Sequence, residues 1–187
     1  LLKGWSEGLS MMCLSFSYGV TATYVAIYGK ETLNISGGSA LFFMLLSLGL
    51  ILSRLVGSRT LRQGKITQNA SVGVLISLCG YLMFALLQNP IGYYCSAFIV
   101  GLGNGHMWPA YQTMFLNLAP HTQRGTANSS ILISWDIGVG LGTLIGGAIA
   151  EHCGYQQAFI ASALVNLIGI IIFFGYAKND FLKNKLR

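Results

Sequence analysis

The chain has 187 residues, of which 53% are hydrophobic and only 9% are charged. Soluble domains carry about 25% charged residues, so this composition excludes a soluble globular protein and predicts an all-α integral membrane protein. The net charge of +6 would suggest nucleic acid as a partner for a soluble protein. In a membrane protein it reflects loop topology, so we expect a lipid bilayer and no nucleic acid as partner.

Charges and turn signals divide the sequence into runs that can cross a bilayer, which takes about 20 mainly apolar residues. Residues 66–123 contain no Asp, Glu, Lys or Arg, but the turn signal "QNPIG" at 88–92 splits this stretch into two. We predict a single bundle over 1–187, with six spans at approximately 9–28, 35–55, 70–87, 91–115, 129–150 and 158–176.

The basic residues predict the orientation of the bundle. With six spans both ends of the chain lie on one side, and every Lys and Arg except Lys30 falls on that side. Because Lys and Arg near span ends are retained in the cytoplasm, we expect both termini to be cytoplasmic. The chain begins with Leu1 and shows no signal segment, so we expect it to be the later part of a longer protein.

Small residues and one proline predict how the helices pack. Gly138, Gly142 and Gly146 are spaced by four residues on one side of the fifth span. In lipid, small residues let helix backbones approach closely, which predicts a packing seam. Pro109 removes a backbone donor within the fourth span and predicts either a static kink or a hinge.

The thiols and histidines suggest neither a metal site nor a cofactor. His106 is flanked by glycines, which favours a packing histidine, and His152 beside Glu151 favours a solvated pair in an outer loop. The cysteines lack metal-ligand spacing and are predicted to be packing thiols. They are Cys13, Cys79, Cys95 and Cys153.

Polar side chains form ordered stripes when each helix is turned by 100° per residue. Because polar groups that face hydrocarbon are costly, the stripes face protein or water. We interpret them as the lining of a shared cavity that binds an amphipathic small molecule. The alternative is ordinary interhelical hydrogen bonding. The candidate cavity residues are Ser17, Thr21, Tyr24 and Tyr28 in the first span and Asn104, Trp108, Tyr111 and Gln112 in the fourth.

Asp136 is the only charged residue between Arg124 and Glu151. A carboxylate near a helix centre costs about 2.5–3.5 kcal/mol on insertion scales, so we expect protein to cover it. It shares a helix face with Ser129 and Gly140. Three roles stay open: pairing with a cation from elsewhere, interhelical hydrogen bonding, and binding and release of a proton.

Three segments carry a resemblance to a known family: "GSRTLRQGK" at 57–65, "PHTQRGTANSSILISWDIGVGLGTLIGG" at 120–147 and "GYQQAF" at 154–159. Together with six spans and both ends inside, they resemble the C-terminal half of a major facilitator superfamily transporter. The resemblance is greatest to the sugar- and drug-efflux-like members, the drug:proton antiporters.

Particular residues match the family's motifs. In the cytoplasmic gating-loop motif Gly57, Arg62, Gly64 and Lys65 match. Leu61 replaces the motif's acidic residue, so a gating role of this loop does not follow from the resemblance. The start of the fifth span matches the family's eleventh helix at Arg124, Gly125 and Asn128 and again at 136–138.

The resemblance implies a mechanism and partners. Members alternate between inward- and outward-open states, and each half contains two inverted three-helix repeats. The first and fourth spans would line the cavity, the second and fifth would flank it, and the third and sixth would support it. The implied partners are the N-terminal six-helix half and a small-molecule substrate, in a bacterial inner membrane.

Three functional hypotheses follow. The first is a secondary transporter without enzymatic activity that exports a small organic solute or drug, coupled to protons. The second is uptake or facilitated transport of a sugar, amino acid or other metabolite. The third, a remote one, is a rhomboid-like intramembrane serine protease. For that role Ser39 in "GGSA" lacks the expected following glycine and a placed histidine.

Overall fold

The structure is a computed structural model that describes residues 4–186, and every regular element in that range is a helix. The predicted class, an all-α integral membrane bundle, is therefore confirmed. The six long helices are α1 (Trp5–Glu31), α2 (Gly38–Arg62), α3 (Ile66–Leu86), α4 (Pro90–Leu118), α5 (Arg124–Cys153) and α6 (Tyr155–Ile172). A 3₁₀ turn, η2 (His121–Gln123), precedes α5, and a π turn, η3 (Phe173–Ala177), joins α6 to α7 (Lys178–Asn184).

The helices extend beyond the predicted spans, because apolarity marks only the part of a helix that crosses hydrocarbon. The α5 helix begins at Arg124, and the last helical run continues to Asn184. The break between α3 and α4 has a local cause. The Asn89 side chain accepts a hydrogen bond from the Gly92 amide at 2.6 Å, and Pro90 occupies the first turn, which together start a helix.

Within residues 4–186, five helical stretches are long and apolar enough to cross a membrane. They are 5–31, 38–62, 66–86, 121–153 and 155–184. The α4 helix has 29 residues but carries polar side chains such as Asn104 and Gln112. Because α4 packs lengthwise between α2 and α3, we treat it as the sixth span.

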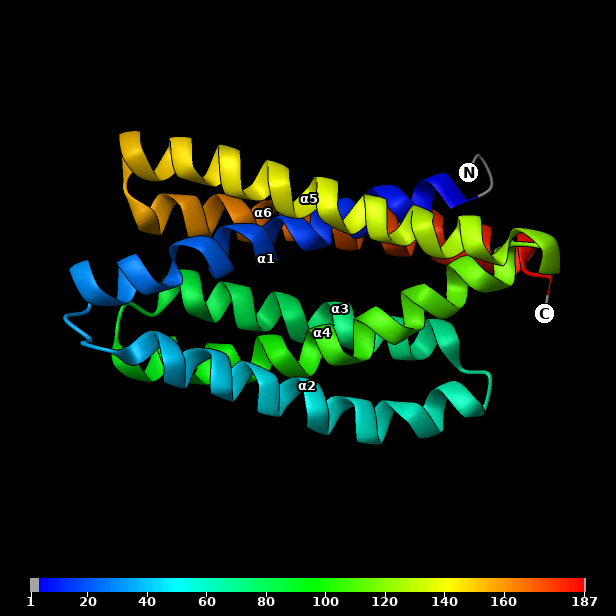
Figure 1. The fold of residues 1–187 in the computed structure, drawn as a ribbon, viewed down its shortest axis with the longest axis horizontal. Helices are drawn as coiled ribbons and strands as arrows, with labels where there is room; N and C mark the ends of the chain where they lie inside the picture. The colour runs from blue at the N-terminus through cyan, green and yellow to red at the C-terminus, as the bar shows by residue number, and fades with distance from the viewer. Residues whose placement is uncertain (1–3, 187) are drawn as a thin grey trace.

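The helices form two groups of three, which Figure 1 shows one above the other. The α1 helix packs mainly against α5 and α6, whereas α4 packs mainly against α2 and α3. The first helix of each half of the chain, α1 or α4, thus packs with the last two helices of the other half. This exchange is the pattern of two three-helix repeats, which the sequence alone does not show.

Close approaches of helix backbones hold each group together. A Cβ added at Gly138 or Gly142 would collide with carbonyl oxygens of α1, and one at Gly146 would lie 2.8 Å from the Val20 side chain. The group of α2, α3 and α4 is packed in the same way, because a Cβ at Gly49 in α2 or Gly101 in α4 would collide with the facing backbone. Glycine is therefore required where α5 meets α1 and where α2 meets α4.

Both ends of the described chain lie at one end of the bundle (Figure 1). We call this the terminal end; it contains the start of α1, the connections 63–65 and 119–123, and α7. Most of the described basic residues lie there or in the last turns leading to it, whereas Lys30 ends α1 at the opposite end. One apolar core cluster lies on the side of the terminal end and a second lies towards the other.

Candidate membrane substrate site

Three aromatic side chains meet where the two helix groups join. The rings of Trp108 in α4 and Trp135 in α5 lie edge to face, with centroids 5.0 Å apart. Tyr18 in α1 contacts Trp135 at a centroid distance of 5.3 Å. All three are only half-buried, so each ring keeps free surface. We call Tyr18, Trp108 and Trp135 the aromatic junction.

The packing seam of α5 determines the direction in which Trp135 points. Ile131, Trp135, Gly138 and Gly142 follow one another at intervals of three or four residues, so they lie on one side of α5. Gly138 and Gly142 fix this side against α1. Trp135, one turn nearer the terminal end, is therefore directed towards Tyr18 and the end of α4.

Polar bonds join the same helices on either side of the aromatic junction. One turn beyond Trp108, the Gln112 amide nitrogen donates to the Asn128 side-chain oxygen of α5 at 3.1 Å. In the other direction, the Tyr24 hydroxyl donates to the Thr143 carbonyl oxygen at 2.8 Å. Gln112, Asn128 and Tyr24 are half-buried, so hydrogen-bonding groups lie along the helices on both sides of the aromatic junction.

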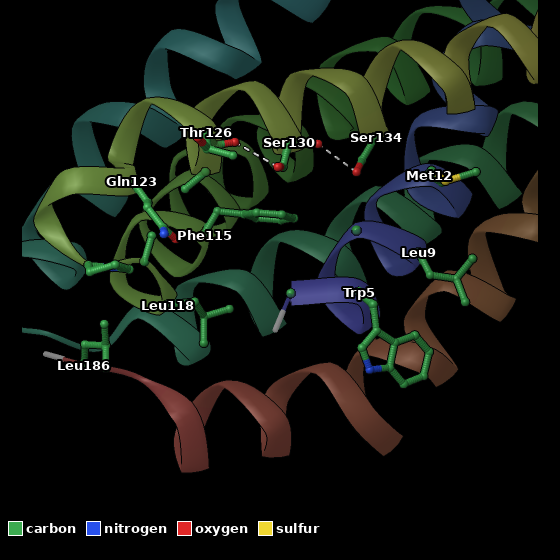
Figure 2. A pocket seen from close by; sticks show the side chains of 15 residues that line it. Trp5, Leu9, Met12, Phe115, Leu118, Gln123, Thr126, Ser130, Ser134 and Leu186 are labelled. Carbon is green, nitrogen blue, oxygen red and sulfur yellow. Dashed lines mark hydrogen bonds between the residues drawn. The ribbon is translucent and has the colours of Figure 1, made fainter. Parts of the chain in front are cut away.

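A pocket of about 1020 Å³ opens at the terminal end between α1, the end of α4 and the start of α5 (Figure 2). Figure 2 shows Trp5 and Leu9 on one side and Phe115 and Leu118 on the other. The other residues that line it are Gly4, Gly8, Met12, Ala119, Pro120, Gln123, Thr126, Ala127, Ser130, Ser134 and Leu186. Its size and largely apolar lining are those of small-molecule sites. We call it the terminal pocket.

The two serine hydroxyl groups in the terminal pocket donate hydrogen bonds within their own helix. Ser134 donates to the Ser130 carbonyl oxygen at 2.9 Å, and Ser130 donates to the Thr126 carbonyl oxygen at 2.8 Å (Figure 2). The hydroxyl oxygens of Ser130 and Ser134 can then only accept a hydrogen bond from a ligand. Ser134, which lines the terminal pocket, precedes Trp135 of the aromatic junction in α5. The chain's 3 tryptophans all belong to these two features.

The predicted cavity stripe of α1 lies mostly inside the bundle. Ser17 donates to the Ser162 carbonyl oxygen of α6 at 2.6 Å, and Tyr28 packs against Phe84 and Phe159. Thr21 is buried and its hydroxyl has no partner within the described chain. These residues join α1 to other helices, which is the interhelical alternative. Tyr24 alone of this stripe lies on the half-buried face.

The predicted stripe of α4 is divided between the interior and the site. Tyr111 is fully buried and shares a hydrogen bond of 2.7 Å with the Ser10 hydroxyl. Asn104 is 6% exposed and its amide lies 3.5 Å from the Tyr81 hydroxyl of α3. Trp108 and Gln112 are half-buried beside α5, as described above.

Asp136 lies on the outer face of α5 and is exposed together with Gly140. Within residues 4–186 its carboxylate has no hydrogen-bonding or ionic partner. A Cβ added at Gly140 would meet nothing within 4 Å. This face of α5 is therefore an open surface with a carboxylate, whereas the other charged residues of α5 lie at the ends of the helix.

The loop-motif glycine makes room for a histidine. A Cβ at Gly57 would lie 2.7 Å from His106 Nδ1. Asn69 holds this histidine at two points: its Nδ2 donates to the His106 carbonyl oxygen, and its Oδ1 lies opposite Nδ1, each at 2.9 Å. Arg62, Gly64 and Lys65 are exposed, and Gly64 has a φ of 74°, a left-handed conformation that favours glycine.

The remaining motif residues lie at the start of α5. Arg124 and Gly125 are exposed, and Asn128 bonds to Gln112. In the described part of the chain, no three His, Cys, Asp or Glu residues come together as a metal site. Sequence reasoning missed Tyr18 and Trp135. The signal for Trp135 was its place on the same helix side as the glycine seam.

These features define a class: an integral membrane helix bundle of two three-helix groups, with a pocket between them. The chain belongs to the Major Facilitator Superfamily, whose family model matches residues 2–139 and 93–185. The double match covers nearly the whole chain. The family resemblance inferred from the sequence is thus confirmed.

Individual relatives are similar over part of their length. Multidrug resistance protein MdtG of Erwinia billingiae is 30% identical over 98 residues, which is 52% of this chain and 24% of that protein. An uncharacterized MFS-type transporter of Burkholderia mallei is 25% identical over 168 residues, 89% of this chain and 40% of that protein. The chain therefore spans less than half the length of these relatives.

Solved structures share the fold at low sequence identity. A peptide transporter POT crystallised with sulfate superposes with a TM-score of 0.83 at 16% identity, over 99% of this chain and 39% of that one. An inward-facing bacterial homolog of the human lysosomal transporter Spinster superposes with a TM-score of 0.76 at 16% identity. That match covers 99% of this chain and 50% of the homolog.

Proposed function

We propose that the chain is the C-terminal half of a secondary transporter that exports a small, largely apolar organic solute or drug. The observation that carries the proposal is the half-buried aromatic junction beside a pocket of about 1020 Å³. Aromatic rings with free faces bind flat apolar groups, and nearby amides fix orientation. The similarity to a multidrug resistance protein supports the same class of solute.

The charge distribution supports a cytoplasmic position of the terminal end. Arg59, Arg62 and Lys65 lie at the terminal end, which by the positive-inside rule faces the cytoplasm. The terminal pocket opens at that end, so in this conformation it is accessible to a solute from the cytoplasmic side. In a bacterium this is the inner membrane.

The open face of α5 supports a partner half. An exposed carboxylate in hydrocarbon is costly, and Asp136 with Gly140 offers both a charge and room for close approach. The N-terminal six helices of the same transporter would cover this face. Alternating access then consists of the two halves rocking around the aromatic junction.

Fluorescence and transport assays test the proposal. In the full-length transporter, solutes that bind should quench the fluorescence of Trp5, Trp108 and Trp135, and replacing these three by Phe should remove that quenching. In proteoliposomes, export should require a proton gradient and stop with an uncoupler. Binding that leaves the three tryptophans unchanged would contradict the site. Transport that is indifferent to the uncoupler would support the alternative, facilitated movement of a metabolite.

A further inference from the structure

Glu7 is a fully buried carboxyl group on the first turn of α1. Ser6 Oγ donates to its Oε2 at 3.0 Å, and its Oε1 has no hydrogen-bond partner. No cationic side chain of residues 4–186 forms an ion pair with it. Asp136 is exposed and open to a partner half, whereas Glu7 is 0% exposed.

Among residues 4–186, the charged group that acts electrostatically on Glu7 is Asp180, which is negative. Asp180 of α7 lies near enough to repel a negative charge on Glu7, and Tyr111 of α4 lies within electrostatic range. From α5, the residues that line the nearby terminal pocket are not ionisable. The titratable groups that surround the start of α1 are Cys13 on α1, Tyr111 on α4, Tyr176 on η3, and Asp180 and Lys183 on α7.

The balance of effects favours a neutral Glu7. The N-terminus of α1 stabilises an anion on its first turn, but an unpaired buried charge costs several times more than this helix-terminus effect provides. One neutral donor, Ser6, does not replace a cation. We propose that Glu7 is a proton-binding site, that it carries a proton in this conformation, and that it releases the proton when α1 and α7 separate.

A second pocket provides the route for the proton. It has a volume of about 230 Å³ and lies between the start of α1 and the η3–α7 segment. Ser6, Asp180 and Lys183 all line it. When water fills this pocket, a hydronium ion passes a proton to the Ser6 oxygen while the Ser6 hydroxyl proton moves to Glu7 Oε2. The carboxylate gains one O–H bond, the hydronium ion becomes water, and Ser6 is unchanged.

The same turn of α1 borders the candidate solute site. Trp5, Gly8 and Leu9 line the terminal pocket, while Trp5 and Ser6 line the second pocket. One turn further on, Ser10 is fixed by the Tyr111 hydroxyl and by the Gly169 carbonyl oxygen, at 2.7 and 2.8 Å. Ser10 therefore ties the second turn of α1 to α4 and α6, while the first turn, which carries Glu7, borders the terminal pocket. A role as the coupling proton rests on the proposed function, whereas the proton site itself does not.

Infrared difference spectroscopy on the full-length transporter in lipid nanodiscs tests the proton site. The chain contributes 5 carboxyl groups. At neutral pH we expect a protonated-carboxyl C=O band that disappears in Glu7→Gln and persists in the controls Asp136→Asn and Glu151→Gln. Ser6→Ala should shift the band to higher frequency, because the carboxyl loses its donor. A spectrum without the band, or a band that persists in Glu7→Gln, would overturn the proposal.

Fluorescence on the same samples separates the two proposals. Solute quenching of the three tryptophans reports the solute site, whereas the infrared band reports the proton site. If the band belongs to Glu7 but no solute binds, the proton site stands and the transport proposal fails. If solute binds and no band belongs to Glu7, the solute site stands and the proton-site proposal fails. Should Glu7→Gln fail to fold, the Ser6→Ala shift decides, since an unshifted band cannot come from Glu7.

Discussion

The indole rings of Trp108 and Trp135 meet edge to face, with centroids 5.0 Å apart and planes inclined at 80°. This contact joins α4, from one helix group, to α5, from the other. The two groups otherwise touch mainly through α3 and α6. Trp108 and Trp135 are therefore placed to report, and to resist, any separation of the groups on the side of α4 and α5.

Replacing Trp135 with Ala should weaken solute binding. Aromatic pairs contribute about 0.5–1.5 kcal/mol beyond the area that they bury, so we expect a loss of roughly 2- to 12-fold in affinity. Titration calorimetry with a bound solute measures this change. Trp135→Phe keeps a ring in contact with Tyr18 and serves as the matched control. Equal affinities for the Ala variant and the wild type would remove Trp135 from the site.

Replacing Gly142 with Ala should destabilise the contact between α5 and α1. The added methyl group would collide with the Phe16 backbone, which cannot move aside as a flexible side chain can. Overpacking of this kind costs about 1–3 kcal/mol. Thermal unfolding in detergent measures the change.

Gly125→Ala, at the start of α5, is the control for Gly142→Ala, since the added methyl group meets nothing within 4 Å. It should leave stability unchanged or raise it slightly, because alanine favours a helix more than glycine does. If Gly142→Ala unfolds at the wild-type temperature, the close approach of α5 to α1 is contradicted.

The spacing of residues along the sequence predicted the packing seam and the helix bundle. It did not predict which polar stripe faces the aromatic junction and the terminal pocket. The seam follows from four-residue spacing in a single helix, which the sequence contains. The stripe of α1 was ambiguous because α1 is surrounded by protein on several sides. Ser17 and Tyr28 face α6 and the interior, while Tyr18, one residue from Ser17, faces the aromatic junction. Deciding between these faces requires knowing that α1 leaves its own half to pack with α5 and α6.

Two other features lay outside what local patterns reveal. Glu7 precedes the predicted first span, so its charge marked the end of an apolar run rather than a buried site. Its burial depends on α7, which lies more than 160 residues away in the chain. The partner of His106 is Asn69, a residue on another helix, and periodicity within α4 cannot identify it.

Replacing Asn69 with Ala should destabilise the helix group formed by α2, α3 and α4. The substitution leaves the His106 carbonyl oxygen and Nδ1 without the partners that they have at 2.9 Å. A buried polar group without a partner costs about 1–3 kcal/mol, so we expect a clear fall in unfolding temperature. Ser58→Ala is the control, because Ser58 is bonded only to Leu55 within α2. A double-mutant cycle with His106→Ala should give a coupling energy; additive effects would contradict the contact.

Replacing Asp136 with Asn should affect coupling rather than folding. The carboxylate has no partner within residues 4–186, so its loss removes no contact of this half, and expression should stay at the wild-type level. If Asp136 pairs with a cation of the partner half, Asp136→Lys should impair assembly, because like charges would then meet at a face open at Gly140.

Asp136→Asn should also reduce proton-driven export if the carboxylate takes part in coupling. Full coupling in Asp136→Asn, together with its loss in Glu7→Gln, would place the coupling proton on α1. The reverse pattern would place it on α5, and flux with and without an uncoupler separates the two results.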